Sequence, residues 1–141
     1  MPEKNYQILE LGPMSGWDQF VAGPLPKPGR KFLDKEIQLE FFGVTINSRE
    51  PGEEAGYWHS HKALEELYLF LEGQGEMALD DTVVPVQAGT AVRVGQGVMR
   101  TWRCLPGSQG PLRWICIRAG GAKLAEITGD AHPITDLPFP W

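Results

Sequence analysis

The amino-acid sequence predicts an all-β domain, a small antiparallel barrel or sandwich, on the basis of three observations. Short runs rich in Val, Ile, Leu and aromatic residues recur between residues 37 and 118, separated by Gly, Pro or Asp. No segment of this range has the apolar period of about 3.6 residues that marks an amphipathic helix. The chain has 141 residues, of which 42% are apolar and 22% charged, so it is long enough for one compact core.

The expected strands follow one another closely along the chain. In order they are "IQLEFFGVTIN", "EELYLFLEG", "GEMALDD", "TVVPVQAG", "TAVRVG", "VMRTWRCLPG" and "LRWICIRAG". The glycines of "EGQGEM" are expected to form a hairpin turn between two of these runs. Residues 1–36 and 119–141 are predicted to be N- and C-terminal arms packed on a barrel of residues 37–118, with at most a helical turn at "AKLAEI".

Composition and charge exclude several classes of partner. The net charge is -5 and no basic cluster is present, which argues against binding to nucleic acid or to an anionic membrane. No run approaches the roughly 18 apolar residues of a membrane span, and no apolar stretch follows the charges of "MPEKNYQILE". We therefore expect a cytoplasmic protein, in which Cys104 and Cys116, the two cysteines, are buried thiols in apolar surroundings.

The stretch "HSHKALEE" places two histidines and two glutamates just before an apolar run. Because side chains alternate along a strand, His59 and His61 share one face, and Glu66, Tyr68 and Phe70 share a face of the next strand. Two imidazoles and a carboxylate that converge would suit a divalent metal such as non-haem iron. The competing interpretation is a polar turn with partly exposed histidines and solvated glutamates.

The segment "PGEEAGYWHSHKALEELYLFLEGQG" resembles the first motif of the cupins: a glycine, His-x-His, a glutamate, six residues and a glycine. Gly73 follows Glu66 at this spacing, whereas Gly52 lies one residue further from His59 than the usual pattern. The resemblance implies a small antiparallel β-barrel, the double-stranded β-helix or jelly roll, which is usually a homodimer. It also implies a divalent ion (Fe, Mn, Zn or Ni) held by His59, His61, Glu66 and a third histidine from a second motif.

The second motif departs from the cupin pattern in "GTAVRVGQGVMR". Gly89 is followed by five residues and by Gly95-Gln96-Gly97, but Arg100 stands where the third histidine is expected. Arginine has no lone pair to give a metal. Arg100 could hold an anionic ligand, pair with Glu66 in place of a metal, or face the solvent.

Alternation also predicts the lining of the lumen. If Arg100 points inward, Trp102 does as well, and Tyr68, Phe70 and Trp102 would form an aromatic wall that binds a ligand or only fills the core. The leucines of "LYLFLEG" would then face outward, covered by the N-terminal arm or by a second copy in a homodimer.

The last strand has two possible orientations. Either Trp114 and Cys116 face the lumen, or Arg113, Ile115 and Ile117 do, and the apolar period does not choose between them.

Two classes of function are consistent with these residues. One is a metal-dependent cupin, an oxygenase or isomerase, that acts on a small anionic molecule oriented by Arg100. The other is a metal-free module that binds or senses a small molecule, with a Glu66–Arg100 pair in the lumen; a structural or storage role is a third, weaker hypothesis. The cupin fold hosts enzymes and binders alike, so the sequence assigns neither catalytic residues nor a substrate.

Overall fold

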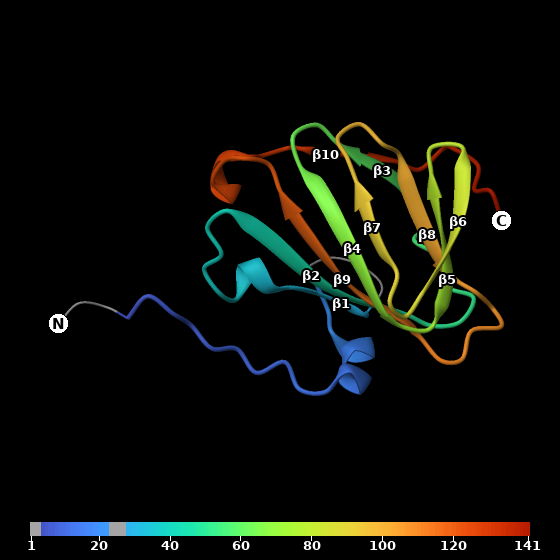
Figure 1. The fold of residues 1–141 in the computed structure, drawn as a ribbon, viewed down its shortest axis with the longest axis horizontal. Coiled ribbons are helices and arrows are strands. Elements are labelled where there is room, and N and C mark those ends of the chain that lie inside the picture. Colours follow the sequence, from blue (N-terminus) through green and yellow to red (C-terminus); the bar gives the residue numbers. More distant parts are fainter. Residues whose placement is uncertain (1–3, 23–27) are drawn as a thin grey trace.

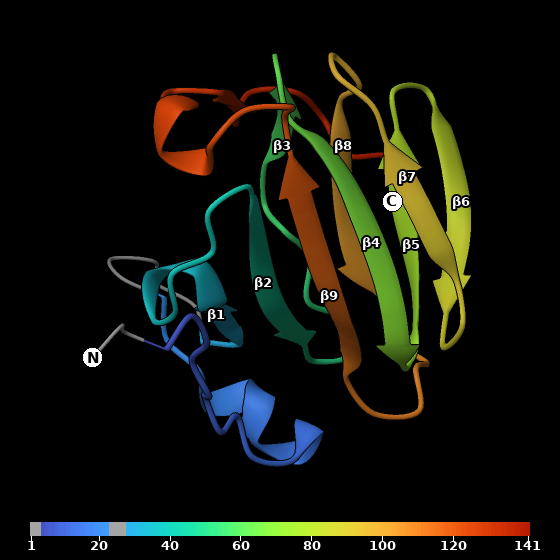
Figure 2. The same ribbon diagram turned by 60° about the vertical axis from the view of Figure 1, so that its left-hand side comes forward.

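Two antiparallel five-stranded sheets face each other in the computed structural model, which describes residues 4–22 and 28–141 (Figure 1). The first sheet contains β1 (Arg30–Phe32), β2 (Phe42–Arg49), β9 (Leu112–Ala119), β4 (Glu65–Glu72) and β7 (Ala91–Val94), in that order in space. The second contains β10 (Ala131–Ile134), β3 (Trp58–His61), β8 (Arg100–Cys104), β5 (Gln74–Leu79) and β6 (Thr82–Gln87). Short 3₁₀ turns are η1 (Met14–Gln19), η2 (Leu33–Lys35) and η3 (Leu124–Glu126). This arrangement in two sheets, also seen in Figure 2, confirms the prediction of an all-β jelly roll.

Alternating side chains from both sheets fill the space between the layers. On β4, Tyr68 and Phe70 are almost fully buried and their rings stack on each other. On β9, Trp114 and Cys116 belong to the same apolar core, which settles the orientation that the sequence leaves open. Arg113 of β9 instead lies in ion pairs outside this core. The core is thus built from every second residue of its strands, as the strand period requires.

Gly73 does not form the expected hairpin. β4 and β5 on either side of it belong to different sheets, so the chain crosses from one layer to the other at this residue. Gly73 has a φ of 83°, and a side chain there would collide with the backbone of Pro111 and Leu112. Positive φ and lack of space both favour glycine at this residue. Here both are properties of a crossing between sheets, not of a hairpin turn.

Both predicted arms add an edge strand to the fold. In the N-terminal arm, η1 lies against β1 and β2 and buries Trp17, while residues 1–3 and 23–27 lie outside the described residues. In the C-terminal arm, β10 pairs with β3, and Trp58 of β3 donates to the Pro138 carbonyl at 3.2 Å and stacks on Phe139. Leu67, on the outer face of β4, stays 39% exposed. The arms therefore extend the sheets at their edges but leave this part of the outer face open.

Among the described residues, no helix has the length and apolar character needed to cross a lipid bilayer.

Candidate metal centre

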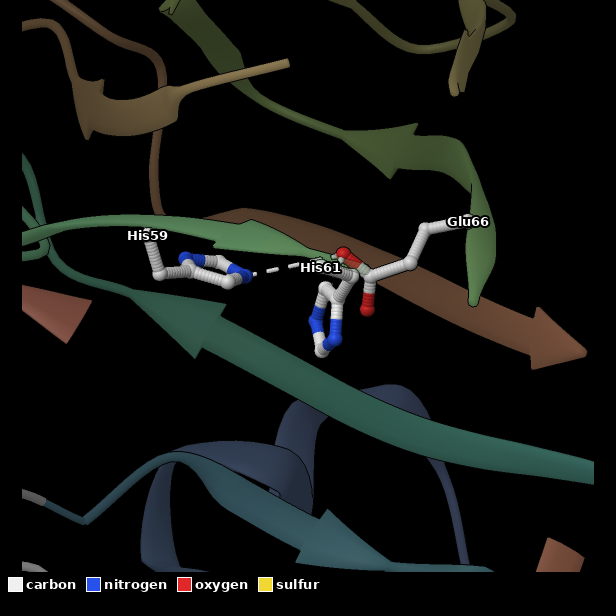
Figure 3. Close-up of side chains that lie close together, drawn as sticks. All are labelled: His59, His61 and Glu66. Atoms are coloured by element: carbon white, nitrogen blue, oxygen red, sulfur yellow. Dashed lines mark ion pairs between the residues drawn. The ribbon is translucent and has the colours of Figure 1, made fainter. Parts of the chain in front are cut away.

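The two histidines and the glutamate reach the same point from opposite sheets. His59 and His61 alternate with Ser60 on β3, so both rings point between the layers. Glu66 comes from the start of β4 on the facing sheet. Figure 3 shows both imidazoles pointing toward the Glu66 carboxylate, and all three side chains are buried.

Three ligand atoms, one from each side chain, lie within 4.8 Å of one another. His59 Nε2 is 3.6 Å and His61 Nε2 is 3.7 Å from Glu66 Oε1. These separations are long for hydrogen bonds, but they suit atoms that each bind one shared ion at about 2.0–2.2 Å. The convergence expected from "HSHKALEE" is present, and the group is positioned to bind a metal.

His61 is held by Asp130, which lies just before β10. Asp130 Oδ2 is 3.1 Å from His61 Nδ1, and the carboxylate also accepts hydrogen bonds from the backbone amides of Ala63 and Leu64. Burial would raise the pKa of Asp130, but the bonds from Ala63, Leu64 and His61 outweigh it and keep the pKa below its usual range. An ionised Asp130 favours a hydrogen on His61 Nδ1, which leaves Nε2 as the nitrogen directed toward Glu66. An ion between Nε2 and Oε1, which are 3.7 Å apart, would be within reach of both atoms.

His59 supplies the second nitrogen of the candidate site, and its ring is buried. Its Nδ1 is buried and has no hydrogen-bond partner among the described residues. Burial lowers the pKa of His59, and although Glu66 acts in the opposite direction, the net pKa is below its usual value. At neutral pH the ring is therefore uncharged and has a lone pair to give a metal.

Glu66 is already strongly hydrogen-bonded within the protein. Its Oε1 accepts from Arg100 Nη2 at 2.5 Å and from the Tyr68 hydroxyl at 2.8 Å, and its Oε2 lies 3.3 Å from the Cys116 thiol. Burial would raise the pKa of Glu66, but His59, Arg100 and His61 together hold it far below its usual value. Glu66 is thus a carboxylate at all moderate pH values, as a metal ligand must be.

Arg100 occupies the inner end of this site. It is fully buried and donates to Glu66, to Val98 O at 2.8 Å and to the Tyr68 hydroxyl at 3.4 Å. Of the three roles considered for this residue, the solvent-exposed one is wrong and the pairing with Glu66 is present. A bound ion is compatible with this arrangement because Arg100 and Tyr68 engage Glu66 Oε1 and leave Oε2 and the two histidine Nε2 atoms to hold it, but the guanidinium charge opposes its binding.

A pocket of about 490 Å³ opens onto the two histidines and Glu66. Its other walls come from β1, from Thr45 and Tyr57, from Arg118, and from Ala131 and Pro133 of β10. Four residues expected to contact a ligand do not line it: Arg100, Tyr68, Phe70 and Trp102. Tyr68 reaches the site through its hydroxyl, while Phe70 and Trp102 pack in the core. Direct ligand contact by these four residues stays a prediction.

Sequence reasoning did not single out two residues of this region. Asp130 orients His61 from 69 positions away, and Arg30 lines the pocket from the N-terminal arm. Neither belongs to a local motif. Their positions follow from the pairing of β10 with β3 and of β1 with β2, which short-range patterns do not reveal.

The fold and the site together define a jelly-roll domain with a His-His-Glu centre between its two sheets. The cupin domain family matches residues 48–118, half of the chain, and the protein belongs to this family. No curated protein matches the chain in sequence.

Solved structures show the same fold. A cupin protein from Bacteroides fragilis is 27% identical, with a TM-score of 0.66, over 99% of this chain and 100% of that one. A conserved double-stranded beta-helix protein from Klebsiella pneumoniae is 15% identical, with a TM-score of 0.66, over 90% of this chain and 98% of that one. Pac13 from Streptomyces, a nucleoside dehydratase, is 16% identical, with a TM-score of 0.54, over 67% of this chain and 68% of that one.

Proposed function

We propose that this cupin binds a divalent metal through His59, His61 and Glu66 and takes a small anionic molecule in the adjoining pocket. The observation that carries the proposal is the convergence of His59 Nε2 and His61 Nε2 on Glu66 Oε1, at 3.6 and 3.7 Å, with the glutamate ionised. Nitrogen and oxygen donors of this kind suit Fe, Mn, Zn or Ni. When bound, the ion would supply Lewis-acid or redox chemistry of the type used by an isomerase or an oxygenase.

The surrounding residues have positioning roles in this proposal. Asp130 fixes the tautomer of His61, and Arg100 and Tyr68 fix the Glu66 carboxylate. Burial raises the pKa of Tyr68 well above its usual value, so its hydroxyl stays protonated and donates to Glu66. The pKa of the Cys116 thiol is likewise raised well above its usual value by burial and by Glu66. Neither group is therefore suited to exchange protons with a ligand near neutral pH.

Elemental analysis of the purified protein, followed by titration of metal-free protein with each of the four ions, tests the proposal. We expect one ion per chain in the wild type and loss of stoichiometric binding in His61→Ala, because a three-ligand site has none to spare. His132→Ala is the matched control, since His132 lies exposed on β10. A wild type that neither contains nor takes up any of these ions would contradict the proposal.

A metal-free small-molecule module is the second candidate, and one observation favours it. Both hydrogen-bonding positions of Glu66 Oε1 are already taken, by Arg100 and by Tyr68. Under this alternative the Glu66–Arg100 pair replaces the ion, and the pocket binds its ligand equally well after exhaustive treatment with a chelator.

A further inference from the structure

Arg30 differs from the other arginines that line or flank the site. Arg118 pairs with Asp34 at 2.8 Å, and Arg100 pairs with Glu66. None of the ion pairs found among residues 4–22 and 28–141 includes Arg30. Its charge is thus left without a carboxylate partner in the described part of the protein.

The Arg30 side chain is nevertheless held in place. Its Nε donates to Asn47 Oδ1 at 3.1 Å, across the β1–β2 ladder where the two residues are paired. The guanidinium lies 5.9 Å from the centre of the Trp102 ring, and Nη1 is 3.5 Å from the Tyr57 hydroxyl. These contacts use the Nε hydrogen and one Nη1 hydrogen, and they leave the other Nη hydrogens available.

Arg30 and the candidate metal ligands line the same pocket. Among the side chains of that lining, Glu66 is offset by Arg100 and Arg118 by Asp34, so Arg30 is the charged side chain without an oppositely charged partner. A free guanidinium matches one carboxylate group, because its planar donors fit the two carboxylate oxygens. Phe32 and Pro133 add apolar surface, and a volume of about 490 Å³ is in the range of small-ligand sites.

We infer that Arg30 selects the ligand of this protein: a small organic monocarboxylic acid whose carboxylate pairs with Arg30 while its body extends toward His59 and His61. The inference rests on the proposed function for the pocket and adds the substrate class and the residue that recognises it. Under this inference, the residue that recognises the ligand lies on β1, outside the sequence motif that supplies the metal ligands.

The test uses benzoate as the probe, with benzamide as its neutral analogue and phenyl phosphate as a dianionic one. Each is titrated by calorimetry or ligand-observed NMR into wild type, Arg30→Met and Arg30→Lys, and the metal content of every sample is measured. We expect Arg30→Met to weaken benzoate binding by at least about tenfold, the loss of a charged hydrogen bond, with benzamide binding and metal content unchanged. Arg30→Lys should recover part of the loss because it restores the charge without the planar fork.

Arg93→Met is the matched control, because Arg93 pairs with Glu65 on an exposed surface away from this pocket. Equal benzoate binding by wild type and Arg30→Met, no saturable benzoate binding to wild type, or a preference for benzamide or phenyl phosphate would overturn the inference. If the wild type holds no metal but its benzoate binding depends on Arg30, the inference stands and the metal proposal fails. If the metal is present and benzoate binds equally well to Arg30→Met, the metal proposal stands and the inference about Arg30 fails.

Discussion

Replacing Arg100 by histidine should convert this centre into a tighter metal site. Arg100 stands where the resemblance to cupins places a third histidine, and it is fully buried with Nη2 at 2.5 Å from Glu66 Oε1. Burial alone would lower the pKa of Arg100, but Tyr68 and Glu66 outweigh it and raise the pKa above its usual value. The positive charge is therefore permanent, and any ion bound at Glu66 must lie close to it.

The size of the effect follows from the charges. Two unit charges about 4 Å apart repel by about 4 kcal/mol at an effective dielectric near 20, and a dication doubles this to about 8 kcal/mol. If about a third of that repulsion survives compensation by Glu66, its removal corresponds to roughly a hundredfold gain in affinity. Arg100→His removes the charge and adds an imidazole donor, so we expect at least this gain.

Arg100→Met separates the two contributions. It removes the charge but adds no ligand, so metal affinity should rise by about the hundredfold that the lost repulsion accounts for, and by less than in Arg100→His. Without metal, the variant should be less stable by about 3–5 kcal/mol, because Glu66 becomes a buried charge with no cationic partner. Added metal should then raise its melting temperature more than that of the wild type.

Calorimetric titration of metal-free wild type and both variants measures these affinities, and thermal unfolding measures the stabilities. Arg93→His is the control, since it introduces a histidine in place of an exposed arginine. If Arg100→His binds metal no better than the wild type, Arg100 does not occupy the position of the missing ligand, and the reasoning is wrong.

Three further predictions concern the supports of the site and the assembly. Asp130→Asn should weaken metal binding by about 10–100-fold in titration, because His61 loses its orienting carboxylate. It should also cost about 1 kcal/mol in unfolding, because an amide has one oxygen and cannot accept from both the Ala63 and Leu64 amides. Burial would raise the pKa of Asp18, but bonds from Ser48 and Arg113 lower it overall, so its stabilising effect is present at neutral pH and lost as pH falls below its usual value. Asp18→Asn should therefore cost about 1 kcal/mol in urea unfolding at neutral pH and nothing in acid. We also propose a homodimer that covers the exposed Leu67 surface, which sedimentation of a 15.7 kDa monomer at micromolar concentration would exclude.

The strand period was sufficient to predict most of the centre. Alternation along β4 correctly places Glu66 and Tyr68 on one face, and alternation along β8 places Arg100 and Trp102 inside. These residues lie on strands that the apolar pattern marks clearly. Their convergence follows because β3 and β4 lie in facing sheets.

The remaining parts of the site depend on pairings between distant segments. The segment "AHPI" is only four residues long and contains a proline, so nothing in it signals the edge strand β10 that brings Asp130 to His61. β1 is only three residues long, too short for a period to be recognised, yet it places Arg30 in the pocket. At Gly73 the glycine marks a position of positive φ, but such a φ suits a sheet crossing as well as the predicted hairpin.

The two edge strands at the pocket mouth have a consequence for how such a protein can diverge. β1 and β10 each form hydrogen bonds with a single neighbour, β2 and β3 respectively. A strand at the end of a ladder can change in length or sequence while the ladder beside it stays intact. If Arg30 selects the ligand as inferred, substitutions in β1 would alter which molecule is accepted while β3 and β4, which carry the metal ligands, keep their own pairing. β10 has less freedom, because it pairs with His59 and His61. On these proposals, ligand choice would depend on β1 and metal binding on β3 and β4, so one could change in evolution while the other is kept.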